Sequence, residues 1–118
     1  MAKLERIAPE VPVVNLAESL AYYKTKLAFE VVSEWPDRNY AIVQRDDIAI
    51  HLFEEGAQPR PVGIHIFTEG LDELHDQLQN LGATITQGIE RKPWGNRDFR
   101  VTDPSGNLLK FTEPSTEN

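Results

Sequence analysis

The sequence predicts an α+β domain of two βαβββ modules that curve into an incomplete barrel around a cleft. Three observations support this fold class. The order of one strand, one helix and three strands occurs twice along the 118 residues. A displacement of 55 residues aligns Leu16 with Leu71 and Tyr23 with Leu78. Because each such unit leaves one face of its sheet uncovered, two units side by side can enclose a cleft; an ordinary α+β sandwich without a cleft is the alternative.

Chain length and the distribution of Gly and Pro predict one domain over residues 1–118. A chain of 118 residues is long enough to bury one core but too short for two independent cores. The most linker-like stretch is residues 54–61, which contains Gly and Pro. We therefore expect two modules, about residues 1–56 and 62–118, joined by this linker.

The composition excludes several functions. The formal net charge is −7, and an acidic surface repels phosphate backbones and anionic lipid, so we expect neither a nucleic-acid nor a membrane partner. No apolar run approaches the roughly 20 residues of a membrane span, and residues 1–6 lack the apolar stretch of a signal peptide, which indicates a cytoplasmic protein. The chain has no cysteine, so a metal would have to be held by His, Asp and Glu.

In the first module, one helix is expected between strands. Residues 5–14 are apolar, but Pro9 and Pro12 restrict this segment to an edge, an end or an irregular strand. Asn15 can cap the helix that follows, which we expect over residues 16–27. One face of that helix carries an apolar stripe formed by Leu16, Leu20, Tyr23 and Leu27. The three strands expected after it span residues 29–35, 40–44 and 48–53.

The second module repeats this order. A strand is expected over residues 62–67, followed by a helix that Gly82 ends. The apolar stripe of this helix consists of Leu71, Leu74, Leu78 and Leu81. Later strands are expected to begin at Ala83 and to span residues 99–102 and 108–112. Residues 103–107, Asp-Pro-Ser-Gly-Asn, are typical of a tight turn and predict a hairpin between the last two strands, with Trp94 near its entrance.

Three of these segments resemble the glyoxalase/bleomycin-resistance/dioxygenase superfamily, also called vicinal oxygen chelate proteins. They are residues 15–23 in the first helix, residues 70–74 in the second, and the turn at 103–107. Their order and spacing cover nearly the whole chain. The resemblance implies a homodimer of paired βαβββ modules, with ligand clefts formed by sheet surface from both chains.

Within the superfamily, the chain is most similar to bleomycin-resistance proteins. The similarity rests on residues 1–4, 45–47 and 93–95, the last being Pro-Trp-Gly, followed by Arg-Asp-Phe at 97–99. One departure is Ala28, where the family usually has Gly after the helix.

The resemblance also implies where a metal would be held. Metal-dependent members carry ligands at four sheet positions, which by register fall on Ala8, His51, Gly63 and Lys110. Only His51 binds a metal readily, and a Lys ammonium repels a divalent cation. We therefore expect no metal, no cofactor and no catalytic residue, which favours a binding protein without turnover over an enzyme.

An alternative shifts the first strand of each module by two residues. Side chains two apart on a strand share a face, so the set becomes Glu10, His51 and His65. Two His and one carboxylate suit Fe, Mn or Zn. This set predicts a metal-dependent lyase, isomerase or dioxygenase, although Lys110 would still lie on the same face.

The leading hypothesis is an antibiotic-resistance protein that binds and sequesters a bleomycin-type cationic glycopeptide. Aromatic side chains stack on flat heterocycles and attract cations, and surrounding carboxylates favour a positively charged tail. A small-metabolite-binding protein of the same fold is a further alternative. Core packing is an equally good interpretation of Phe53. The predicted ligand-binding residues are Trp94, Tyr40, Trp35, Phe53, His51, His65 and Lys110.

Overall fold

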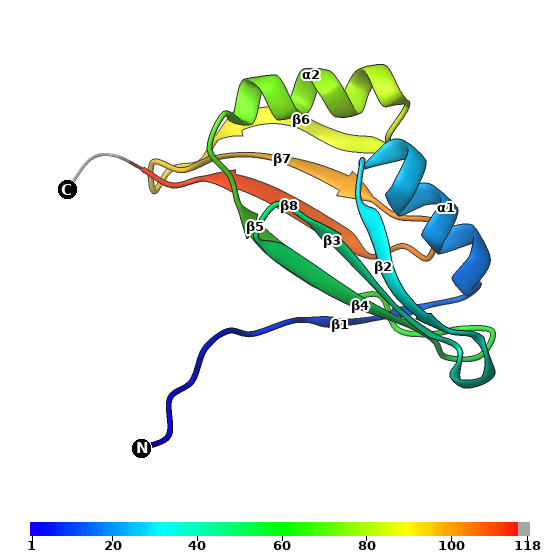
Figure 1. Cartoon of the computed structure of the whole chain (residues 1–118). Coiled ribbons are helices and arrows are strands. Elements are labelled where there is room, and N and C mark those ends of the chain that lie inside the picture. Colours follow the sequence, from blue (N-terminus) through cyan, green and yellow to red (C-terminus); the bar gives the residue numbers. More distant parts are fainter. Residues whose placement is uncertain (116–118) are drawn as a thin grey trace.

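Each half of the chain forms a four-stranded mixed sheet with one helix on one of its faces (Figure 1). The computed structural model describes residues 1–115. The first half contains β1 (Glu10–Val13), α1 (Leu16–Lys26), β2 (Glu30–Trp35), a 3-10 helix (Pro36–Arg38), β3 (Tyr40–Arg45) and β4 (Ile48–Glu54). The second half contains β5 (Gly63–Phe67), α2 (Leu71–Leu81), β6 (Ile85–Arg91), β7 (Arg97–Thr102) and β8 (Leu108–Glu113). The predicted succession of two βαβββ modules is confirmed, and the sheets do not close into a barrel.

The two sheets share one topology. The first sheet has the order β1-β4-β3-β2 and the second has the order β5-β8-β7-β6. In each, the strand before the helix pairs in parallel with the last strand of the module, and the remaining pairs are antiparallel. The repeat in the sequence therefore corresponds to a repeat in strand order.

The helix ends follow the expected local chemistry. The Asn15 side chain accepts a hydrogen bond from the amide of Glu18 at 2.8 Å, which confirms the cap of α1. The amide of Leu16, the first residue of α1, donates to Glu54 Oε1 at 2.9 Å, so β4 also holds this helix end. At the other helix, Gly82 has a φ of 86°, the left-handed conformation that ends α2 without strain on a Cβ.

The apolar stripes of both helices pack into one core with the inner faces of the sheets. Tyr23 and Leu78, which the sequence repeat equates, are both fully buried. Burying one such large apolar side chain contributes about 1.5–3 kcal/mol, so each stripe fixes its helix on its sheet. The sheets contribute Val11, Val13, Ala41, Val43, Ile50, Leu52, Phe99, Val101, Leu109 and Phe111.

Each helix also contacts the other module. Tyr22 Oη on α1 donates to the carbonyl of Thr102 at 3.3 Å, at the end of β7. The guanidinium of Arg45, at the end of β3, donates to Gln77 Oε1 of α2 at 2.6 Å. The two contacts are equivalent by the repeat, so an approximate two-fold relates the modules.

The N-terminal segment differs from the expected strand over residues 5–14. Only Glu10–Val13 forms a strand, at the edge of its sheet, while the residues before it leave the body of the molecule (Figure 1). Leu4 and Ile7 are almost completely exposed. Pro9 directly precedes the strand and its carbonyl accepts a hydrogen bond from the His51 amide at 3.0 Å, while Pro12 lies within the strand, which is tolerated because β1 is an edge strand.

Neither helix found within residues 1–115 has the length and apolar character needed to cross a membrane.

Candidate functional site

One face of each sheet carries no helix, and these two surfaces form the candidate site. In β4, Ile50 and Leu52 point into the core, so the alternating His51 and Phe53 lie on the uncovered face. Strand pairing places other side chains beside them. The first open face consists of Glu10, Trp35, Tyr40, His51 and Phe53.

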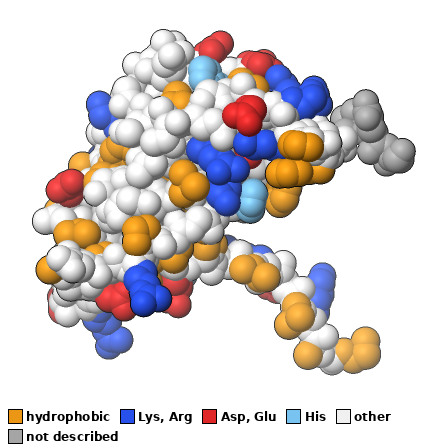
Figure 2. Space-filling view, turned by 180° about the vertical axis from the view of Figure 1, so that it is seen from behind, with side chains coloured by type: hydrophobic (Ala, Val, Ile, Leu, Met, Phe, Trp, Pro, Cys, Tyr) orange, Lys and Arg blue, Asp and Glu red, His pale blue; other side chains and the backbone are white. Residues whose placement is uncertain are grey.

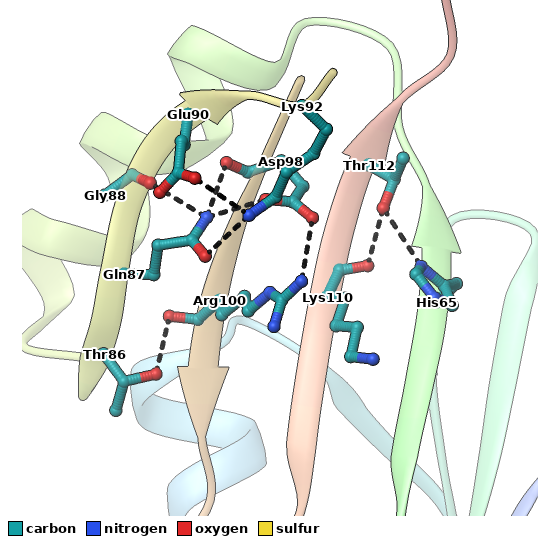
Figure 3. A network of polar contacts seen from close by, with 10 residues as sticks. All are labelled: His65, Thr86, Gln87, Gly88, Glu90, Lys92, Asp98, Arg100, Lys110 and Thr112. Atoms are coloured by element: carbon teal, nitrogen blue, oxygen red, sulfur yellow. Dashed lines mark hydrogen bonds and ion pairs between the residues drawn. The ribbon is translucent and has the colours of Figure 1, made fainter. Parts of the chain in front are cut away.

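The same alternation defines the second open face. In β8, Leu109 and Phe111 are buried against α2, while Lys110 lies on the uncovered side. The second open face consists of His65, Gln87, Lys92, Asp98, Arg100, Lys110 and Thr112, all drawn in Figure 3, together with Phe67, which stacks on His65.

Tyr40 links the residues of the first open face. Its hydroxyl donates to Glu10 Oε2 at 2.8 Å and lies 2.7 Å from His51 Nδ1. Since the single hydroxyl proton goes to Glu10, the His51 bond requires the proton on Nδ1, which leaves the lone pair of Nε2 for a ligand. The Trp35 ring packs edge-on against Tyr40 at 6.1 Å and is 45% exposed. The result is an aromatic surface with one carboxylate and one imidazole acceptor.

The environment of Tyr40 also keeps its hydroxyl protonated. Desolvation, together with the hydrogen bond to the Glu10 carboxylate, raises the pKa of Tyr40 above its ordinary value. The hydroxyl therefore acts as a hydrogen-bond donor and not as a base near neutral pH.

The second open face contains a buried carboxylate surrounded by donors. Asp98 is 3% exposed and accepts a hydrogen bond from Gln87 Nε2 at 2.7 Å (Figure 3). Two cations lie nearby, Lys92 Nζ at 3.7 Å from Oδ1 and Arg100 NH2 at 3.5 Å from Oδ2. A buried charge without such partners would be strongly destabilising.

Basic side chains dominate this face. Lys110 lies directly opposite Arg100 and beside His65 in the strand pairing. The His65 ring stacks on Phe67 at 6.3 Å and lies 3.3 Å from the Thr112 hydroxyl through Nδ1. Figure 2 shows a group of Lys and Arg side chains next to a His on one face of the molecule. The local charge is thus opposite to the net charge of the chain.

Strand pairing places other residues beside His51 and Lys110 than the register inferred for the four metal-ligand positions. Glu10 is the partner of His51, whereas Ala8 precedes β1. Likewise His65 is the partner of Lys110, and Gly63 lies opposite Leu108. The first strand, β1, begins at Glu10, later than the apolar pattern of residues 5–14 suggested.

The residues of the alternative metal set are divided between the sheets. Glu10 and His51 lie on the first open face, and His65 lies on the second. Within residues 1–115, no group of three or more His, Asp or Glu residues is arranged to hold a metal ion. One chain alone therefore does not supply a two-His, one-carboxylate site.

Trp94 lies in the connection between β6 and β7 and so belongs to neither set of strand residues. That connection is closed by hydrogen bonds from the Lys92 amide to the Asn96 carbonyl at 2.7 Å and from the Gly95 amide to the Lys92 carbonyl at 2.9 Å. The Trp94 side chain is 68% exposed. The exposed ring thus lies at the end of the β6–β7 hairpin, just before the β7–β8 hairpin whose entrance it was expected to mark.

The structure brings four of the seven predicted ligand-binding residues together on the first open face, namely Trp35, Tyr40, His51 and Phe53. Phe53 is half-buried and lies on the open side, not in the core. His65 and Lys110 lie on the second face. The sequence did not predict that Phe67, Gln87, Asp98 and Arg100 belong to the site. The alternation of charged and apolar residues over 98–100 could have indicated it, because it places the carboxylate of Asp98 and the guanidinium of Arg100 on the same side of β7.

Comparison with known proteins identifies the family. The model of the Glyoxalase/Bleomycin resistance protein/Dioxygenase superfamily matches residues 3–111. A bleomycin resistance protein of Geobacillus stearothermophilus is 30% identical over 123 residues, covering 87% of this chain and 92% of the relative.

Solved structures agree with this match. A bleomycin-binding protein from Streptomyces verticillus, solved with copper(II)-bleomycin, aligns with a TM-score of 0.77 and 26% identity, over 98% of this chain and all of that chain. A bleomycin resistance determinant encoded on transposon Tn5 aligns with a TM-score of 0.84 and 21% identity, over 97% of this chain and all of that chain, and so shares the fold. The repeated βαβββ topology and these matches together show that the chain belongs to the glyoxalase/bleomycin resistance protein/dioxygenase superfamily.

Proposed function

We propose that this protein binds a bleomycin-type cationic glycopeptide antibiotic and sequesters it in the cytoplasm without turnover. The observation that carries the proposal is the pair of uncovered sheet faces, one aromatic and one basic, in a chain 30% identical to a bleomycin resistance protein. Pockets that bind small molecules combine apolar and aromatic surface with a few placed polar groups, and the first open face has this composition.

The aromatic side chains account for recognition of a planar ligand. Trp35 and Trp94 are both substantially exposed, although burying them would be favourable. A flat bithiazole stacks on such rings, and a cationic terminus is attracted by their faces and by the Glu10 carboxylate.

Homodimerisation would complete the site. In a single chain both open faces lack a covering layer, because each helix lies on the opposite side of its sheet. We propose that two copies associate so that the first open face of one protomer lies across from the second open face of the other. The groove between them would combine Tyr40 and Glu10 with Lys110 and Arg100.

Calorimetric titration with bleomycin tests the proposal. We expect binding with one drug per groove, and Trp94→Ala should weaken it by roughly tenfold, since one lost stacking contact is worth about 1–2 kcal/mol. Trp94→Phe is the matched control and should retain most of the affinity. Mass spectrometry should recover the drug unmodified. Absence of heat at high micromolar drug would refute the proposal.

Two further measurements address the assembly and the role in cells. Sedimentation analysis should give a mass of two chains, and a monomer would contradict the shared groove. Expression in a bleomycin-sensitive bacterium should raise the tolerated drug concentration, and Trp94→Ala should reduce that protection without lowering the amount of protein.

A metal-dependent lyase, isomerase or dioxygenase is the second candidate function. It is favoured by the β1–β4 pairing, which sets Glu10 beside His51 and leaves His51 Nε2 unbonded by Tyr40. In the proposed dimer, His65 of the other protomer could add the third ligand for Fe, Mn or Zn. Elemental analysis of protein purified without added metal distinguishes the candidates, since binding alone requires no stoichiometric metal.

A binding protein for an unrelated small metabolite would share the fold and the open faces. Competition experiments separate this possibility from drug sequestration. If a cytosolic metabolite displaced bleomycin at a concentration well below that of the drug, the antibiotic would not be the preferred ligand.

A further inference from the structure

The two junctions between the modules are unequal. At one junction, the five-residue turn between β7 and β8 packs against the start of α1. Asn107 Nδ2 donates to the Pro12 carbonyl at 2.7 Å, and the Val14 amide donates to Ser105 Oγ at 2.8 Å. The buried Tyr23 hydroxyl donates to Asp103 at 2.8 Å. This junction is filled by the turn.

At the equivalent junction the turn is shorter. Only Asp46 and Asp47 connect β3 with β4, and they face the loop before α2. The contact between Arg45 and Gln77 remains, but the space that the longer turn fills at the first junction stays open here. It forms a crevice with a volume of about 670 Å³, within the range of small-molecule sites.

Apolar side chains form the floor of the crevice. Phe29 and Phe111 contribute buried rings, and Ile66 and Leu74 are only partly covered. The sequence repeat aligns Leu74 with Ser19, a small residue at the filled junction. A larger apolar side chain therefore faces the open space, although the fold tolerates a small polar one at the equivalent position.

Carboxylates surround the mouth. Asp47, Glu69 and Glu73 line it, and none of the three has a side-chain partner within residues 1–115. Arg45 is already engaged, since its guanidinium donates to the Leu27 carbonyl at 2.8 Å and to Gln77. The mouth is thus acidic, in contrast to the basic second open face.

We propose that this crevice is a second binding site, for an organic ammonium ion with an aryl or alkyl body. The body would lie on the floor formed by Phe29, Ile66 and Leu74, and the ammonium group would lie among the carboxylates of the mouth. Apolar burial supplies most of the affinity, while the charges select cations over anions. The crevice borders the second open face at Phe67, but its floor and mouth are formed by other residues, and the proposal does not depend on the bleomycin proposal.

Titration with 3-phenylpropylamine at neutral pH, followed by amide chemical shifts in NMR, tests this site. We expect shifts concentrated in residues 45–48 and 66–77, which define the crevice. The matched anion 3-phenylpropionate should bind at least tenfold more weakly. Equal affinity of the two probes, or shifts confined to the open faces, would overturn the proposal.

Variants separate charge from shape. Asp47→Asn combined with Glu73→Gln should weaken amine binding by about fivefold at low salt, because two partly screened ion pairs are lost. The matched control, Glu34→Gln combined with Asp37→Asn, changes the net charge equally but lies outside the crevice and should leave binding unchanged. An equal loss in both double variants would indicate a general charge effect and refute a specific site.

Leu74→Ser introduces the residue of the filled junction and should reduce amine binding severalfold, whereas Leu74→Met should preserve it. Sedimentation of both variants tests whether the crevice instead receives a second copy of the chain. A change of oligomeric state in Leu74→Ser, with amine binding unchanged, would overturn the proposal.

Discussion

Asn107 is the residue of the β7–β8 turn whose loss should damage the fold most. Its side chain is 1% exposed and makes three hydrogen bonds. Nδ2 donates to the Pro12 carbonyl at 2.7 Å and to Asp103 Oδ2 at 3.0 Å, and Oδ1 accepts from the Val62 amide at 2.9 Å. One amide therefore joins β1, the turn and the segment that leads into β5.

Asn107→Ala should lower the free energy of unfolding by about 2–4 kcal/mol. The substitution leaves the Pro12 carbonyl and the Val62 amide without partners, and each buried unpaired group costs about 1–3 kcal/mol, reduced where water can enter. Asp103 loses less, because Tyr23 and backbone amides still bind it. For a chain of this size the melting temperature should fall by roughly 10 °C.

Urea unfolding followed by circular dichroism and tryptophan fluorescence measures this loss. The protein concentration must be the same for every variant, because association would add to apparent stability. Asn80→Ala, the same substitution at an exposed position of α2, is the control and should change stability by less than 0.5 kcal/mol, the usual range for surface sites. A loss below about 1 kcal/mol for Asn107→Ala would refute the reasoning that this side chain joins the modules.

Three further substitutions test the remaining structural arguments. Arg97 binds Asp72 and Glu113 and lowers the pKa of both carboxyls below their ordinary values. The two ion pairs therefore stabilise the fold fully above the ordinary carboxyl pKa, and this stabilisation is lost as the pH falls through the lowered pKa of the folded state. Arg97→Met should flatten the acid side of a plot of stability against pH, and an unchanged plot would contradict the role of these ion pairs. Ala28 has a φ of 59°, a conformation that costs an L-residue about 1–2 kcal/mol. Ala28→Gly should raise the free energy of unfolding in urea by about 0.5–1 kcal/mol, because glycine removes this strain but also adds entropy to the unfolded chain. A lower free energy of unfolding would show that the strain is absent. Tyr23→Phe removes a buried hydrogen bond to a carboxylate and should cost about 1.5–3 kcal/mol. Because burial raises the pKa of Tyr23 well above its ordinary value, this hydroxyl stays protonated in the folded protein, so the substitution should leave the native ultraviolet pH titration unchanged; loss of one titrating tyrosine would be the contrary result.

Local signals in the sequence predicted the elements because each has a short-range cause. Asn15 caps α1 and Gly82 ends α2 through contacts within a few residues, and these features were read correctly. The departure at Ala28 from the family's Gly also has a structural meaning, since the backbone there is left-handed. Local chemistry thus supplied the order of strands and helices.

Contacts across strands were harder to predict because they depend on register. The Tyr40 hydroxyl joins Glu10 and His51, which are 41 residues apart in sequence, and a shift of two residues in β1 replaces Glu10 by Ala8. The apolar pattern of residues 5–14 does not fix that shift, since the segment forms an edge strand and contains two prolines, Pro9 and Pro12. Pairing information from the structure was required to assign the partner of His51.

The net charge of the chain is a poor guide to the charge of its candidate groove. The chain carries a net charge of −7, yet the second open face presents Lys110 together with Lys92 and Arg100, the two cations beside the buried Asp98. Excess carboxylates lie elsewhere, including the mouth of the crevice. A cationic ligand in the groove would consequently have its positive end near Glu10 and the aromatic rings, and its oxygen-rich groups near Lys110, because interactions at contact distance outweigh a screened global charge. In the proposed groove the two faces would therefore orient the ligand, which the acidity of the chain as a whole would not do.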